Sequence, residues 1–183
     1  MFIQTEQTPN PATLKFIPGR PVLGDRTANF VDAAAAAVSP LARKLFEIEG
    51  VTGVFLGGNF ITVTKAGGDW QGLKPIILGT IMEHFTSGEP VLEAAAEADE
   101  TMADDPDDLP VIGQIKELLD TRVRPAVARD GGDITFHGFR QGVVYLHMKG
   151  SCSGCPSSTA TLKHGIENLL RHYIPEVSEV RAI

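Results

Sequence analysis

The sequence has 183 residues, 43% of them hydrophobic, and a formal net charge of −7. This length suits one domain or two small ones, and the negative charge argues against nucleic acid as a main partner. No run of 18 apolar residues occurs, so a membrane-spanning helix and a membrane partner are not expected. The first six residues have no basic region and no long apolar run, which predicts neither a signal peptide nor a transit peptide. A reducing compartment is therefore expected.

An acidic stretch divides the chain into two parts. Between Glu89 and Pro110 there are nine acidic residues and no lysine or arginine, whereas the rest of the chain carries 14 acids and 16 bases. Like charges repel each other and keep a segment solvated. We therefore predict a linker over residues 89–109 that joins two small domains, residues 1–88 and 110–183. An acidic helix over residues 93–100 is the alternative interpretation of part of this stretch.

The first part has the pattern of two hairpins and two helices. Short apolar runs that end at turn residues predict four strands, at residues 2–5, 14–17, 51–56 and 60–64. Ser39 and Pro40 suit the start of a helix that ends before Gly50, and Asp69 suits the cap of a second, amphipathic helix. The order ββαββα predicts a small sandwich of one sheet and two helices.

Little in this first part indicates chemistry. His84 is its one histidine and falls on the last turn of the second helix, where a packing or surface role is expected. Gly57-Gly58 is interpreted as a turn, and Trp70 is expected to fasten the helix to the sheet. The part therefore has the character of an interaction or regulatory module.

The second part has the order αββαβ. Pro110 suits the start of a helix, and Pro125 is expected to kink or interrupt it. Alternating and apolar runs predict three strands, at residues 134–139, 143–149 and 177–180. A helix that ends near Tyr173 is predicted between the second and the third strand. The complete chain is thus predicted to have an α+β fold made of two small α/β-sandwich domains.

Both cysteines of the chain, Cys152 and Cys155, fall in the loop between the second of these strands and the helix. Pro156 suits the first helical turn, and the following hydroxyl side chains can bond the unpaired first-turn N–H groups. The positive end of a helix favours thiolate over thiol. Two thiolates held close together form half of a metal site.

A tetrahedral zinc site or an iron–sulfur cluster usually takes four protein ligands. Either histidines or a second copy of the chain must then complete the site. His147 and His164 flank the loop and are the candidates for a zinc-stabilised interaction protein, although both suit ordinary surface positions. A dithiol oxidoreductase would use the same pair of cysteines, and a structural disulfide across so short a ring is a further alternative.

Longer stretches of the sequence resemble a known family. The second part resembles the NifU-like C-terminal domain, on Arg124-Pro125, Asp130-Gly131-Gly132-Asp133 and residues 149–159. The first part resembles the N-terminal domain of Nfu-type proteins, on short stretches that follow one another in order: Gln4-Thr5-Glu6, Thr8-Pro9-Asn10-Pro11, Leu14-Lys15-Phe16, Ser39-Pro40-Leu41-Ala42 and Gly50-Val51-Thr52-Gly53-Val54. The acidic stretch between them has no counterpart in this resemblance.

The resemblance implies an iron–sulfur cluster carrier or scaffold and no enzyme. Two chains would each give Cys152 and Cys155 to one bridging [4Fe–4S] cluster, so a homodimer is implied. Assembly scaffold proteins would supply the cluster and apo-proteins would receive it by exchange of thiolate ligands, without a catalytic residue. The bacterial cytoplasm is the expected compartment, with the mitochondrial matrix, for a processed protein, as the alternative.

Overall fold

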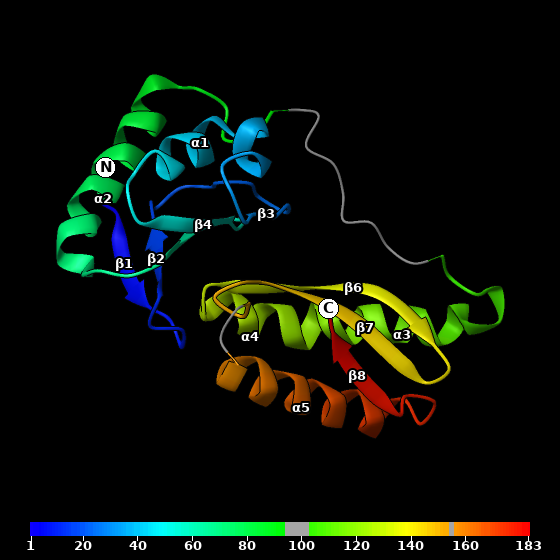
Figure 1. Ribbon diagram of the computed structural model, residues 1–183. Coiled ribbons are helices and arrows are strands. Elements are labelled where there is room, and N and C mark those ends of the chain that lie inside the picture. Colours follow the sequence, from blue (N-terminus) through cyan, green and yellow to red (C-terminus); the bar gives the residue numbers. More distant parts are fainter. Residues whose placement is uncertain (94–102, 154–155) are drawn as a thin grey trace. The chain divides into compact units, whose positions relative to one another are not determined.

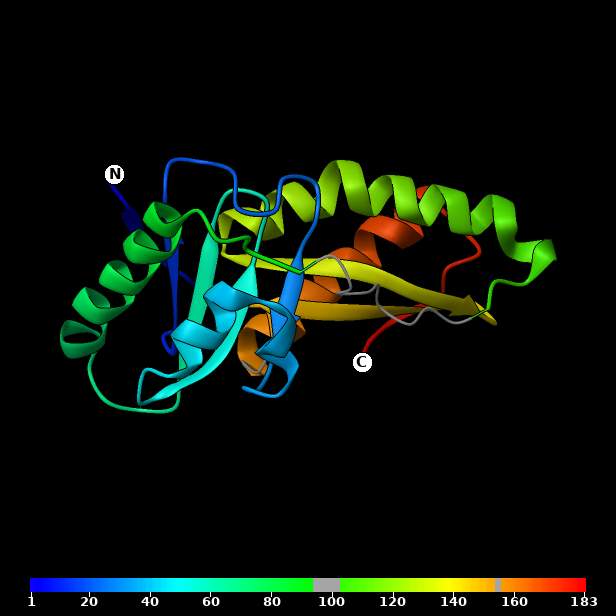
Figure 2. The same ribbon diagram turned by 90° about the horizontal axis from the view of Figure 1, so that it is seen from above.

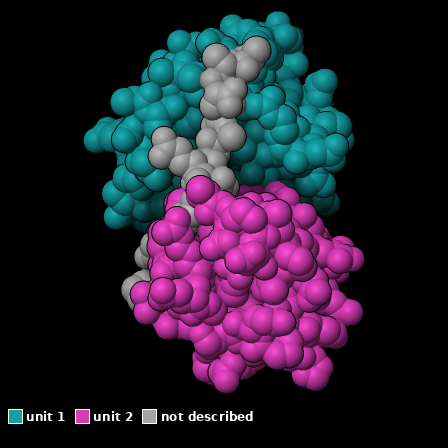
Figure 3. All heavy atoms as spheres, turned by 90° about the vertical axis from the view of Figure 1, so that its right-hand side faces the viewer, with its two compact units in different colours: residues 1–97 teal, residues 98–183 magenta. Residues whose placement is uncertain are grey.

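The structure is a computed structural model, and it describes residues 1–93, 103–153 and 156–183, with side chains in the last range from Thr159 onward. The chain forms two compact units, residues 1–97 and 98–183, which Figure 3 shows in separate colours. None of the helices in the described residues is long and apolar enough to span a membrane.

The first unit is built on a five-stranded sheet with the order β1-β2-β5-β4-β3. All neighbouring strands in it are antiparallel, and their bounds are Gln4–Gln7 (β1), Thr13–Ile17 (β2), Ala28–Phe30 (β3), Val51–Leu56 (β4) and Ile61–Lys65 (β5). Four of these were predicted. The expected order ββαββα is wrong in one respect, because β3 is an additional strand. It has three residues, too few for an alternating pattern, and it exists through its pairing with β4.

The helices of this unit begin where the sequence predicts. Ser39 caps α1 (Pro40–Phe46) by accepting a hydrogen bond from the Ala42 N–H, and Asp69 caps α2 (Trp70–Ser87) in the same way at Gln71. A short 3-10 helix, η1 (Ala35–Val38), precedes α1. The helices and the sheet share one hydrophobic core, and Figure 1 shows α1 and α2 beside the strands of this unit. Trp70 packs against this core and donates a hydrogen bond to the Pro11 carbonyl, which confirms that it fastens the helix to the sheet.

The second unit consists of a segmented helix, a long hairpin, a second helix and a final strand. The elements are η2 (Pro106–Asp108), α3 (Leu109–Leu118), η3 (Leu119–Val123), α4 (Arg124–Arg129), β6 (Gly132–Arg140), β7 (Val143–Gly150), α5 (Pro156–Tyr173) and β8 (Glu179–Ala182). The hairpin is antiparallel, and β8 pairs with β7 in parallel. Figure 2 shows the segmented helix running along the hairpin. The predicted α+β class and the order αββαβ are confirmed.

The interruption expected at Pro125 takes the form of a π-helical turn. Residues Leu119–Val123 are π-helical, and α4 resumes with Pro125 near its start. Proline has no N–H to give and its ring displaces the carbonyl of the preceding turn, so a widened turn accommodates it without ending the helix. The helix therefore continues to Arg129, close to the start of β6.

The core of this unit lies between the sheet and its helices. Along β7 the buried residues alternate with partly exposed ones, and the buried phase is Val144, Leu146, Met148 and Gly150. The first three belong to one hydrophobic cluster with residues of α3, α4 and α5. One face of the strand thus lies against the core, and the opposite, partly exposed face carries Tyr145, His147 and Lys149.

The described ends of the predicted linker make contacts. At its start, the Lys44 ammonium bonds the Glu89 carboxylate at 2.7 Å, and the Ser39 hydroxyl donates to the Val91 carbonyl at 2.5 Å. At its end, Asp105 caps η2. The predicted helix over residues 93–100 lies outside the described residues except for residue 93.

Candidate metal centre

The cysteine loop begins where β7 ends. Gly150 has a φ of 65°, a conformation that glycine adopts without steric penalty, and the chain turns there. The Ser153 N–H and hydroxyl both bond the Gly150 carbonyl, and the Thr159 hydroxyl of α5 donates to the Cys152 carbonyl at 2.8 Å. The loop is therefore tied to the strand before it and to the helix after it. Cys155 lies outside the described residues.

Cys152 lies in the hydrophobic core of its unit, with 6% of its surface exposed. The pKa of its thiol is raised from 9.0 to about 11, mainly by burial. A hydrogen bond with the Ser151 side chain acts in the opposite direction, and the carboxylates of Asp130 and Asp133 contribute smaller increases to the same total. The sequence predicts that the helix start favours the thiolate, whereas the loss of water on burial favours the thiol.

Gly132, the first residue of β6, lies directly against Cys152. It pairs with Gly150 across the hairpin. A Cβ atom on Gly132 would stand 2.6 Å from the Cys152 sulfur and 2.7 Å from the Lys149 carbonyl oxygen. The space that a side chain would fill is thus taken by the sulfur and the loop backbone. Glycine at this position allows the cysteine to sit beside the strand.

An ion pair fixes the strand that carries this glycine. The Arg124 Nε and Nη2 atoms donate to the two oxygens of the Asp133 carboxylate at 2.9 and 3.0 Å. One of these oxygens also accepts from the Ile134 N–H at 2.8 Å, and Asp133 is buried. The Ser151 hydroxyl donates to the Asp130 carbonyl, so the cysteine loop and the turn before β6 are joined directly.

These contacts explain residues for which no individual role was predicted. Arg124, Asp130, Gly132 and Asp133 stand 19 to 28 positions before Cys152 in the sequence and surround its loop in the fold. The available signal was the unusual run Asp130-Gly131-Gly132-Asp133, which ends one helix and begins a strand. It was used only as part of the resemblance to the NifU-like domain, without a role for its residues.

The histidines considered as zinc ligands do not join Cys152. His147 belongs to the phase of β7 that faces away from the core in which Cys152 is buried. His164 is exposed on α5. Among the described residues, no group of three or more histidine, cysteine or acidic side chains is placed to hold a metal ion.

Both parts of the chain match known protein families. Residues 3–88 match the family described as scaffold protein Nfu/NifU N terminal, and residues 115–181 match the NifU-like domain. These domains define a scaffold protein of two domains. The chain belongs to the Nfu family.

The relatives are similar over the complete chain. It is 54% identical over 185 residues to the human protein named NFU1 iron-sulfur cluster scaffold homolog, mitochondrial, and covers 72% of that protein. It is 52% identical to the protein of the same name from Drosophila virilis and covers 62% of it. A solved NifU-like protein from Saccharomyces cerevisiae is 26% identical, with a TM-score of 0.46, over 51% of this chain and 86% of that protein. The chain thus spans about two thirds of the length of these first two relatives.

Proposed function

We propose that this protein is an iron–sulfur cluster carrier. Two chains each contribute Cys152 and Cys155 to one bridging [4Fe–4S] cluster, which is then delivered to apo-proteins. The observation that carries the proposal is the ligand count: such a cluster takes four thiolates, and the chain has two cysteines. Membership of the Nfu family and the names of the relatives support it.

The start of α5 beside the cysteine loop suits an anionic cargo. Gly132 allows the Cys152 sulfur to lie directly against the backbone of β6. The loop also leads directly into α5, an 18-residue helix, and the backbone N–H groups at a helix start stabilise negative charge. A cluster with four thiolate ligands is negatively charged, so these dipoles reduce the cost of holding it between two chains.

The raised pKa of Cys152 suits a carrier that must release its cargo. With a pKa of about 11, this thiol is protonated in the cluster-free protein at neutral pH. Binding the cluster displaces the proton, and a recipient thiolate that replaces Cys152 allows it to take a proton up again. Transfer is then a ligand exchange in which no redox change and no catalytic residue take part. We therefore propose a carrier role for the protein and no enzymatic one.

The burial and the raised pKa of Cys152 also disfavour the dithiol oxidoreductase. A redox-active cysteine is accessible and has a lowered pKa, whereas Cys152 is buried and its pKa is raised. Zinc-stabilised interaction through His147 or His164 is disfavoured by the positions of both residues. The cluster carrier remains the function that these observations support best.

Cluster transfer requires partners and a reducing compartment. We propose assembly scaffold proteins as donors, apo-proteins as recipients and a homodimer as the cluster-bound form. Free thiolates are stable in the bacterial cytoplasm and in the mitochondrial matrix, and the names of the relatives favour the mitochondrial alternative.

We also propose that residues 110–183 carry the cluster and residues 1–88 provide an interaction module, joined through residues 89–109. A fragment of residues 103–183 retains the contact between Asp104 and Lys116 at 3.7 Å and both cysteines. It is expected to fold and to take up cluster alone. A folded fragment that never takes up cluster would show that both parts build the site.

The central test is the composition of the protein purified without oxygen. Iron, acid-labile sulfide and native mass, measured together, are expected to give about four irons for two chains. Cys152→Ala and Cys155→Ala should lose the cluster and keep the far-UV circular dichroism spectrum. Ser153→Ala is the matched control in the same loop, because the Ser153 backbone N–H retains the bond to Gly150. A complete cluster on a single chain without added thiol, or a normal cluster in both cysteine variants, would overturn the proposal.

A further inference from the structure

Two histidines of the second unit lie in direct contact, away from the cysteine loop. The Nε2 atom of His147 in β7 is 3.1 Å from the Nδ1 atom of His137 in β6. The ring centroids are 4.7 Å apart and the ring planes are almost perpendicular. Both side chains are partly exposed.

An irregularity in the hairpin creates this contact. The pairing of β6 with β7 is regular up to Phe136 and Leu146 and resumes with Gly138 and Tyr145. His137 is therefore the additional residue of a β-bulge, without a partner of its own in the register. A bulge bends the strand and redirects one side chain, and here the redirected side chain meets His147.

We propose that His137 and His147 form a binding site for a divalent transition-metal ion, separate from the cysteines. Imidazole is a preferred ligand of Zn²⁺, Ni²⁺, Cu²⁺ and Fe²⁺. Two imidazole nitrogens bound to one tetrahedral Zn²⁺ ion are separated by about 3.3 Å, given zinc–nitrogen bonds of about 2.0–2.1 Å. The observed separation of 3.1 Å is close to this value, so a small movement of the rings admits the ion.

Binding requires no change of net charge on the two rings. In the contact, one of the two facing nitrogens donates its hydrogen to the other. When the ion binds, that proton leaves to water and the outer nitrogen of the same ring takes up a proton from water, so both facing nitrogens present lone pairs. The ring hydrogens then lie on His137 Nε2 and His147 Nδ1, the tautomer that a metal-bound histidine retains for its outer hydrogen bond.

The site is open and suits exchange of the ion. Among the described residues, no third histidine, cysteine or acidic side chain completes a group of three at this place, so water or a partner's ligand fills the remaining positions. Closed four-ligand sites are structural, whereas sites with open positions keep their metal accessible. The histidine pair would therefore bind an ion reversibly.

The test uses the full chain with Cys152→Ala and Cys155→Ala, so that thiolates do not compete. Calorimetric titration with Zn²⁺ is expected to show one ion bound per chain. His137→Asn or His147→Asn, added to this background, removes one of the two ligands and should weaken binding by about tenfold or more, since loss of a ligand's supporting residue alone costs about 10–100-fold. His164→Asn is the matched control, because this histidine is exposed on α5 and should leave binding unchanged.

A second measurement uses the wild-type chain and does not depend on the cysteine variants. Long-range ¹H–¹⁵N spectra should show His137 as the Nε2–H tautomer and His147 as the Nδ1–H tautomer when Zn²⁺ is added. The proposal is overturned if zinc binds equally well without either histidine, or if neither histidine changes its tautomer. The contact is then only a hydrogen bond that fastens the bulge. Neither result bears on the cluster, which is assayed separately through iron and sulfide.

Discussion

Gly132 and Cys152 lie so close together that a methyl group on the glycine would stand 2.6 Å from the cysteine sulfur. The same methyl group would also stand 2.7 Å from the Lys149 carbonyl oxygen. Real Cβ atoms do not approach backbone atoms this closely, so either β6 or the cysteine loop would have to move. The first residue of β6 thus determines where the sulfur lies.

Gly132→Ala is accordingly predicted to displace Cys152 and to weaken cluster binding. Overpacking of this kind costs about 1–3 kcal/mol of the free energy of unfolding. We expect a folded protein that releases its cluster to a chelator faster than the wild type does. The rate of loss of the cluster absorbance, together with urea unfolding, measures both effects.

The control for this substitution is Gly113→Ala in α3. Nothing lies within 4 Å of a Cβ atom on Gly113, and alanine favours a helix interior over glycine by about 1 kcal/mol. This variant should be as stable as the wild type or more stable, with unchanged cluster release. Equal release rates for Gly132→Ala and the wild type would show that the contact does not position the sulfur.

The ion pair between Arg124 and Asp133 leads to a second prediction. Arg124→Lys keeps the charge but loses the two parallel hydrogen bonds that a guanidinium makes to a carboxylate, and leaves the buried Asp133 less well paired. We expect a loss of about 1–3 kcal/mol in the free energy of unfolding of the second unit. Arg171→Lys, whose guanidinium is 4.0 Å from Glu167 and mostly exposed, should change stability by less than about 0.5 kcal/mol. Similar effects of both substitutions would contradict a special role for Arg124.

A third prediction concerns the reactivity of Cys152 in the cluster-free protein. Its pKa is raised by burial to about 11, so at pH 8 the thiolate is rare and the sulfur is covered. Alkylation by iodoacetamide, mapped by mass spectrometry, should be at least about tenfold slower in the folded chain than in the chain unfolded in urea. The rate in the folded chain should rise as the pH is raised toward 11. Equal rates in both states at pH 8 would contradict the burial of this thiol.

The elements that sequence analysis predicted are those with strong local signals. Ser39 and Asp69 cap their helices through their own side chains, and such caps can be recognised from neighbouring residues alone. Strand β3 was missed because its three residues are held by pairing with β4. The π-helical turn before Pro125 was expected only as an interruption, since local sequence does not show which kind of turn a helix adopts.

The candidate site was predicted only in part, because some of its contacts depend on the complete fold and not on neighbouring residues. The spacing of Cys152 and Cys155 indicates a metal or cluster loop, but the register of the hairpin brings Gly132 to the sulfur, and the register depends on the complete fold. The pKa of Cys152 depends on burial, which the sequence around it does not reveal. The meeting of His137 with His147 requires a bulge that alternation of residues cannot predict.

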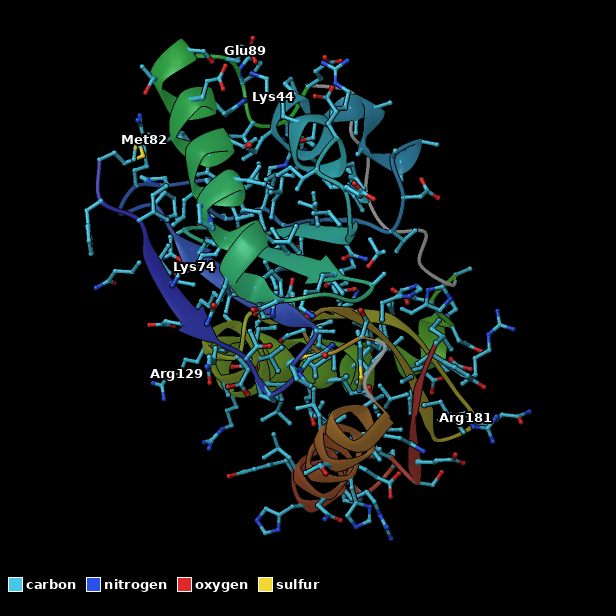
Figure 4. The ribbon with its side chains drawn as sticks, turned by 60° about the vertical axis from the view of Figure 1, so that its left-hand side comes forward. Lys44, Lys74, Met82, Glu89, Arg129 and Arg181 are labelled. Atoms are coloured by element: carbon cyan, nitrogen blue, oxygen red, sulfur yellow. The ribbon has the colours of Figure 1, made fainter. Side chains whose placement is uncertain are left out.

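The last prediction concerns His84, which was expected in a packing or surface role and is completely buried at the end of α2. Neither of its ring nitrogens has a hydrogen-bond partner among the described residues. Its Nδ1 atom is 3.8 Å from the Glu89 carboxylate. Glu89 in turn bonds Lys44 at 2.7 Å, and Figure 4 labels these two residues. Burial, and then the charge of Lys44, lower the pKa of His84, while Glu89 acts in the opposite direction.

Because the pKa of His84 is lower in the folded state than its ordinary value of 6.5, the unfolded chain binds the proton more readily. The first unit should therefore keep its full stability above pH 6.5 and lose stability as the pH falls below it, by at most about 1.4 kcal/mol per pH unit for one proton. The chain's one tryptophan, Trp70, lies in this unit, so its fluorescence during urea unfolding measures the stability of the unit at each pH.

Two variants test the role of His84. His84→Leu removes the titrating group and should reduce the loss of stability between pH 6.5 and 5, whereas Glu89→Gln removes the favourable carboxylate and should increase this loss. If His84→Leu loses stability as steeply as the wild type over this range, another group is responsible.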